Sequence, residues 1–285
     1  MQLDLATVLV QVATGGLAFC WVTTRRREVG LGYGWLLRIT FGVLAALGVL
    51  VGLGDAGAGA TVRNVGAALM VAGATAAQLS STVRRRAGVS GQRAARAARA
   101  ERVAQMVGAA RDEDAVSSDA LAEFDPRLDL AAPIAGVVAL AGAASFVGGD
   151  YVLSLVRLEI GAFFLGAVTD AMLLGHWYLV QPGLARDPIK ELVKLVAALW
   201  PLELAVWLVP TGMVSVLNGT IDDGYGGLIG WMWLISAFTT IGLVVATWFA
   251  LKERAYSAVM AATGLLYLAI LTGFGMDLLP RAVLS

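Results

Sequence analysis

The sequence is poor in the residues on which most catalytic and metal sites depend. Its 285 residues include one cysteine, Cys20, and one histidine, His176. A single cysteine excludes an intrachain disulfide and a CxxC redox pair. A single histidine excludes bis-histidine haem and two-histidine metal sites within one chain. We therefore expect no resident metal or cofactor, and an enzyme is the least favoured class of function.

Charge is also scarce, and long stretches have none. Charged residues make up 15% of the chain and hydrophobic residues 58%, whereas soluble domains average about 25% charged residues. A helix needs roughly 20 apolar residues to cross a bilayer, and five windows of at least that length lack Asp, Glu, Lys and Arg. The sequence predicts an all-α, polytopic bundle of about eight transmembrane helices, at approximately 3–22, 35–54, 62–83, 130–150, 152–178, 188–209, 228–250 and 255–278.

The basic residues are distributed unevenly among the connecting segments. Seventeen of the 21 lie in alternate connections, at 23–34, 84–129, 179–194 and 251–254. Cytoplasmic loops are enriched in Lys and Arg, so we expect both termini on the outer side. The first apolar run has no basic segment before it, which predicts a retained span and not a cleaved signal peptide. The Ala/Gly/Arg-rich composition and compact loops favour the plasma (inner) membrane of a prokaryote.

Residues 84–129 form the longest polar segment, between predicted helices one to three (1–83) and four to eight (130–285). Its first part, 84–111, has a net charge of +7, and its second part, 112–129, has −6. The alanine-rich first part should be helical. We expect its arginines to face anionic lipid headgroups, and the residues concerned are Arg84, Arg85, Arg86, Arg93, Arg96 and Arg99. A solvated topology anchor and a docking surface for a cytoplasmic partner are the alternatives. Nucleic acid is not expected as a partner, because residues 84–123 lack the aromatics that stack on bases.

Ionisable residues inside the predicted helices concentrate on the fifth and sixth. Such residues usually face a bundle interior or a water-filled cavity. From the helical rise, Arg157, Glu159 and Glu203 should share a level near the outer face. Asp170 should lie in the inner half, with Arg38 of the second helix as its expected partner. These charges are interpreted either as structural pairs or as a polar route through the bundle.

Two further residues flank this route. Pro201 removes a helical hydrogen bond close to Glu203, so it is a candidate hinge, although prolines are common in membrane helices. His176 lies near the inner end of the fifth helix and has three interpretations. It is a neutral interface residue, a proton entry group, or a donor to a quinone carbonyl, the last suggested by the spacing of Leu173, His176 and Leu179.

These observations favour translocation of protons, or of a small solute or ion, along the fifth and sixth helices. Arg157, Glu159 and Glu203 would form the outer gate, Asp170 the inner carboxyl and His176 the inner mouth. The alternative is a non-catalytic subunit of a larger membrane complex, such as a respiratory complex with a quinone pocket. The expected partners are the lipid bilayer, and other membrane subunits or further copies of the chain.

Overall fold

The computed structural model describes residues 3–107, 122–181 and 183–284, and every regular element within them is a helix. The helices run, in chain order, α1 (Leu5–Thr24), α2 (Leu31–Val51), η1 (Gly52–Gly54), α3 (Ala58–Val83), η2 (Arg85–Ala87), α4 (Ser90–Val107), η4 (Pro126–Leu130), α5 (Ala131–Ala144), α6 (Tyr151–Val180), α7 (Asp187–Leu208), α8 (Gly212–Leu217), α9 (Leu228–Ala250) and α10 (Tyr256–Val283). The all-helical prediction is confirmed for these residues.

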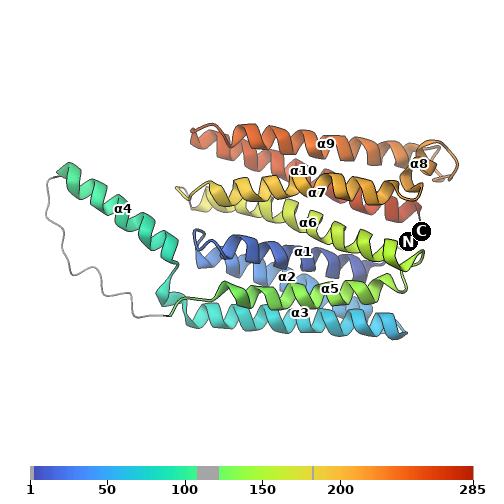
Figure 1. Ribbon diagram of the computed structural model, residues 1–285, viewed down its shortest axis with the longest axis horizontal. Helices are drawn as coiled ribbons and strands as arrows, with labels where there is room; N and C mark the ends of the chain where they lie inside the picture. Colours follow the sequence, from blue (N-terminus) through green and yellow to red (C-terminus); the bar gives the residue numbers. More distant parts are fainter. Residues whose placement is uncertain (1–2, 108–121, 182, 285) are drawn as a thin grey trace.

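Eight long helices form the bundle: α1, α2, α3, α5, α6, α7, α9 and α10. Figure 1 shows them side by side, with α4 projecting from one end and both chain termini at the other. Each of the eight predicted segments corresponds to one of these helices, with boundaries that differ by a few residues.

Six of the eight are long and apolar enough to cross a membrane: α1, α2, η4 with α5, α6, α9 and α10. The other two differ in composition, since α3 is rich in alanine and glycine, and α7 carries charged residues near its start and Glu203 near its end. The composition is therefore that of a multi-pass membrane protein.

The bundle is centred on the contact between α1 and α6. A Cβ atom added to Gly15 would lie 1.8 Å from the carbonyl oxygen of Ala162 on α6, and one added to Gly166 would lie 2.2 Å from the carbonyl carbon of Gly15. The two backbones therefore touch, as small residues allow at membrane helix interfaces. On one side of this contact α1 packs on α2 and α5, and on the other α6 packs on α7 and α10.

The glycine contact makes a direct prediction about stability. Gly15→Ala should destabilise the protein by about 1–3 kcal/mol, because overpacking forces backbone shifts. Gly264→Ala on α10 is the matched control, since a Cβ there would meet nothing within 4 Å. Thermal unfolding of the purified protein in detergent measures both. Equal unfolding temperatures for the two variants would contradict the tight contact.

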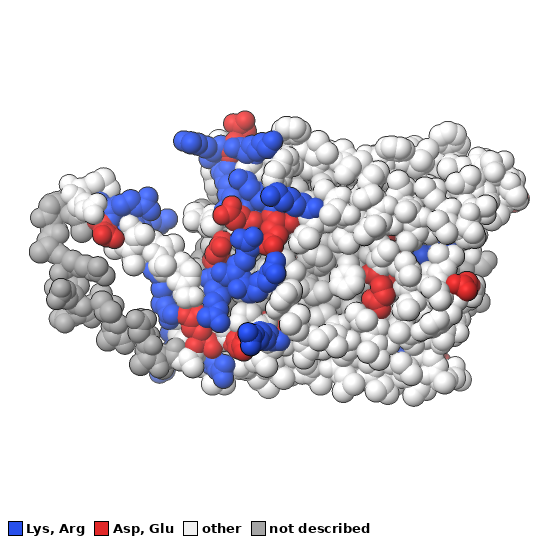
Figure 2. Space-filling model, in the orientation of Figure 1, with Lys and Arg blue, Asp and Glu red and all other residues white. Residues whose placement is uncertain are grey.

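Charged side chains gather at the end of the bundle from which α4 projects, while the flank in view is almost entirely uncharged (Figure 2). The expected helix in the first part of 84–129 is present as α4. It is attached by a hydrogen bond from the amide of Gly91 to the carbonyl of Arg27, at 3.1 Å. Most of the acidic part of that segment, 112–121, lies outside the described residues. The segregation of charge agrees with the alternation of basic connections in the sequence.

Candidate functional site

Two carboxyl groups lie near each other inside the bundle. Glu203 of α7 and Asp277 of α10 are both fully buried and lie within electrostatic range of each other. Glu203 Oε1 accepts a hydrogen bond from Trp207 Nε1 at 2.8 Å. Asp277 Oδ1 accepts from Arg281 at 2.7 Å and from Gln11 Nε2 of α1 at 3.4 Å. We refer to Glu203 and Asp277 together as the acid pair.

The acid pair is assembled by local helical spacing and by a glycine. Residues four apart lie on one helix face, which places Trp207 beside Glu203 and Arg281 beside Asp277. On α6, a Cβ atom at Gly161 would come within 2.4 Å of both Asp277 Oδ1 and Gln11 Nε2. The bare backbone of α6 therefore leaves the space in which the polar side chains of α1 and α10 meet.

Two oxygens of the acid pair have no hydrogen-bond donor among the described residues, namely Glu203 Oε2 and Asp277 Oδ2. A hydrogen bond between two carboxyl groups requires one proton, which would give one of these oxygens its donor. The arrangement therefore leaves room for one proton shared between the two carboxyls.

Arg157 and Glu159 were expected to share a level with Glu203, and among the described residues neither forms a hydrogen bond or an ion pair with it. The Arg157 guanidinium donates to the carbonyls of Val206 and Val209, at 2.9 and 2.7 Å, and lies 4.7 Å from the centre of the Trp207 ring. These carbonyls end α7, where backbone acceptors lack helical partners and a cation is favoured. No described carboxylate lies within ion-pair distance of Arg157. Glu159, two residues on, projects from another side of α6, and its carboxyl oxygens are buried without partners.

Asp170 occupies a second buried acidic position on α6. It is fully buried, and neither carboxyl oxygen has a hydrogen-bond partner in the described part of the chain. Tyr33 of α2 donates to its backbone carbonyl at 3.1 Å. The thiol of Cys20 on α1 lies within electrostatic range of its carboxyl. Asp170 is thus an isolated carboxyl at the junction of α1, α2 and α6.

The expected pairing of Arg38 with Asp170 is wrong. Arg38 instead forms a bidentate ion pair with Asp129. Its Nε donates to Oδ1 at 2.7 Å and its Nη2 to Oδ2 at 2.9 Å, and both side chains are buried. Thr24 donates to the same carboxylate at 2.8 Å, and the Arg38 guanidinium stacks on Phe124 at 4.5 Å. The sequence placed Asp129 in a polar connection. In the structure, η4 folds this residue back against α1.

The Arg38–Asp129 pair should contribute strongly to stability, because removing one partner leaves a buried charge uncompensated. Asp129→Asn should lower the free energy of unfolding by about 3 kcal/mol, measured by thermal or denaturant unfolding in detergent. Asp125→Asn, at an exposed residue that only caps η4, is the control. A loss no larger than in that control would contradict a stabilising role for the pair.

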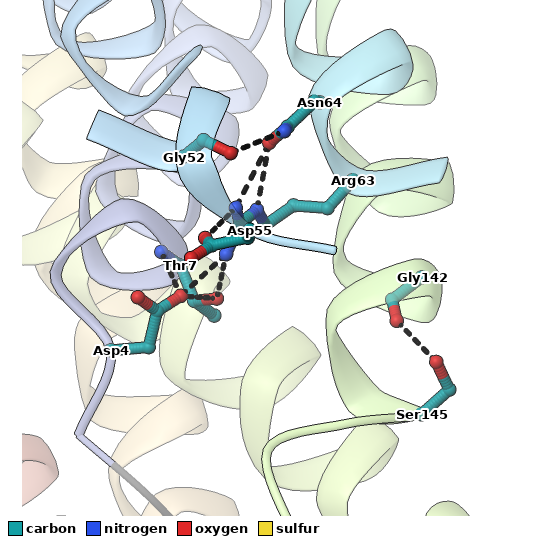
Figure 3. Close-up of polar contacts among 8 residues, drawn as sticks. All are labelled: Asp4, Thr7, Gly52, Asp55, Arg63, Asn64, Gly142 and Ser145. Atoms are coloured by element: carbon teal, nitrogen blue, oxygen red, sulfur yellow. Dashed lines mark hydrogen bonds and ion pairs between the residues drawn. The ribbon is translucent and has the colours of Figure 1, made fainter. Parts of the chain in front are cut away.

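A third polar cluster lies at the end of the bundle that carries the termini (Figure 3). The fully buried Arg63 side chain of α3 pairs with Asp4, which caps α1, and with Asp55, which follows η1. It also donates to Thr7 Oγ1 at 3.3 Å and to Asn64 Oδ1 at 3.0 and 3.1 Å. Because its partners come from three elements, Arg63 ties α1, α2 and α3 together.

His176 and Pro201 lie on the surface of the bundle. His176 is exposed, and its Nδ1 is 3.3 Å from the hydroxyl of Tyr267 on α10. Pro201 is exposed within α7, which continues to Leu208. Neither position tests whether the histidine is a proton entry or whether the proline is a hinge, so both stay predictions.

Sequence reasoning missed Gln11, Asp277 and Arg281. The eighth helix was expected to end at 278, which assigned Arg281 to an outer segment. Here α10 continues to Val283, and Arg281 is buried. The i, i+4 spacing of Asp277 and Arg281 at the end of an apolar helix is the signal that could have identified this pair.

Outside the bundle, the connection before α9 contains Asp222 and Asp223. The backbone amide of Gly227 donates to Asp223 at 2.8 Å, and that of Ile229 at 2.8 Å. These hydrogen bonds, with others from neighbouring amides, lower the pKa of Asp223 below its ordinary value. The side chain therefore stabilises the turn before α9.

Among the described residues there is no group of three His, Cys, Asp or Glu side chains that could hold a metal ion.

No protein-family model, no curated protein and no solved structure matches this chain.

Proposed function

We propose that the chain is an integral membrane protein of eight spans, α3 and α7 included, that moves protons, alone or together with a small solute or ion. Both termini would lie on the outer side of a prokaryotic plasma membrane. The single observation that carries the proposal is the acid pair, Glu203 and Asp277, in the interior of the bundle.

The chemistry of the acid pair favours a proton over other cargoes. Two carboxyls side by side in an apolar interior are stable when one proton is shared, because two adjacent negative charges repel each other. Arg281 and Gln11 hold one carboxyl in place, and Trp207 holds the other. Ionisable groups kept in the interior of membrane proteins commonly mark proton pathways.

Asp170 supplies a second protonatable group on the other side of the bundle's centre. It is nine residues along α6 from Gly161, which contacts Asp277, and this corresponds to about 14 Å. The contact between Gly15 and Gly166 lies between these two levels, since Gly166 falls between Gly161 and Asp170 on α6. We interpret this contact as the barrier that separates the acid pair from Asp170 in a closed state. Asp170 would then serve the inner half, with His176 as a candidate entry group.

Proton flux into proteoliposomes, followed with an enclosed pH-sensitive dye under an imposed potential, tests this function. Glu203→Gln, Asp277→Asn and Asp170→Asn should each reduce flux at least tenfold, because each removes a group that takes up and releases a proton. Glu253→Gln is the control, since Glu253 is exposed in the α9–α10 connection. Unchanged flux in all three bundle variants, with folding intact, would eliminate the proposal.

The exposed contact between His176 and Tyr267 favours the alternative, a non-catalytic subunit that contacts a quinone or a redox partner within the bilayer. Both side chains can hydrogen-bond a carbonyl, and both are reachable from the flank of the bundle. Purification in mild detergent distinguishes the two functions. A stable redox partner, together with the absence of proton flux by the isolated chain, would favour the subunit.

A further inference from the structure

A pocket of about 170 Å³ lies at the basic end of the bundle. Its walls come from α4, from the turn between α1 and α2, and from the connection between α6 and α7. The polar residues among those that line it are Glu28, Gln92, Arg96, Arg99 and Gln181. At roughly 30 Å³ for each water in the liquid, the space suffices for a phosphate group with a short substituent.

The wall formed by α4 is held against the bundle. The amide of Gly91 donates to the carbonyl of Arg27 at 3.1 Å. A Cβ atom at Gly91 would lie 2.6 Å from that same oxygen, so only glycine allows this approach. Arg93 is paired with Glu123 and also donates to the carbonyl of Ala87. The first turns of α4 are therefore fixed over the pocket.

The side chains that α4 contributes to the pocket are hydrogen-bond donors, and the two arginines among them are exposed to solvent. Gln92, Arg96 and Arg99 are spaced i, i+4 and i+7 and so share one helix face. Among the described residues, neither arginine has a hydrogen-bond or ion-pair partner, and the buried Nε2 of Gln92 has no acceptor. An arginine presents five N–H donors in a planar fork that matches the oxygens of a phosphate.

Glu28 contributes a hydrogen-bond acceptor to the pocket. One of its carboxylate oxygens lies 3.7 Å from Arg26, while the other is buried and accepts no hydrogen bond from the described residues. A ligand that fills the pocket therefore has to present an anion toward α4 and a hydrogen-bond donor toward Glu28.

We propose that this pocket binds a phosphate group that carries a hydroxyl or ammonium donor a few bonds away. Arg96 and Arg99 hold the phosphate oxygens, Gln92 adds an amide donor, and Glu28 accepts from the hydroxyl or ammonium group. A glycerophospholipid headgroup and a soluble phosphate ester both have this chemistry. The inference does not depend on proton movement, so either proposal can fail while the other stands.

Binding of short-chain phosphatidylglycerol to the full-length protein in detergent, measured by titration calorimetry, tests the arginines. The double variant Arg96→Gln/Arg99→Gln should weaken binding at least tenfold, because charge-assisted hydrogen bonds are lost. Arg85→Gln/Arg86→Gln removes the same charge from exposed residues outside the pocket and should weaken binding less than threefold. Arg96→Lys/Arg99→Lys keeps the charge without the forked geometry and should weaken binding by an intermediate factor, which provides a second reading if the glutamine variant is unstable.

Two comparisons identify the ligand further. Phosphatidylmethanol has the same charge as phosphatidylglycerol but no hydroxyl donor, so the wild type should bind it at least threefold more weakly. Glu28→Ala, which removes the acceptor, should abolish this preference. Competition by glycerol 3-phosphate at the lipid's own concentration would indicate a soluble ligand, and no competition a lipid. Equal weakening by the two glutamine double variants, or none by either, would show charge attraction only and overturn the pocket.

Discussion

The fold depends on one constraint: a cation buried among apolar helices needs a partner, because an isolated charge there is costly. Four arginines lie outside the basic connections, and all are buried: Arg38, Arg63, Arg157 and Arg281. Each has carboxylates or helix-end carbonyls as partners. Two of the buried carboxyl groups, by contrast, have no hydrogen-bond partner among the described residues, namely those of Glu159 and Asp170. A carboxyl can become neutral by taking up a proton, whereas arginine stays charged, so the buried positions without partners fall on groups that can lose their charge.

The helices could be predicted from the sequence because their causes are local. Charge-free length and periodicity define each segment, and capping residues such as Asp4 and Asp150 define where α1 and α6 begin. The concentration of charge on α6 and α7 also led to Glu203 as a site residue. What failed was the choice of partners. Helical spacing determines the face of α2 on which Arg38 lies. It does not determine which distant segment packs on that face. In the structure that segment is η4, which contributes Asp129.

The proposed roles follow from the position of α1 and α6 at the centre. Along α1, Gln11, Gly15 and Cys20 succeed one another, and the groups they contact or approach on α6 and α10 are, in the same order, Asp277, Gly166 and Asp170. Two polar levels, with a close backbone contact between them, therefore succeed one another along a single helix pair. The sequence did not reveal this order, because Asp277 belongs to the last helix and reaches the pair only through the gap left by Gly161.

The Arg63 cluster limits how this helix pair could separate. Asp4 at the start of α1 forms an ion pair with Arg63 of α3. Asp55, which follows α2 and η1, forms an ion pair with the same Arg63 side chain. With its start secured in this way, α1 is tied to α2 and α3. A rearrangement that parted α1 from α6 would consequently have to carry α2 and α3 along with α1, and α1 would not slide out of its place alone.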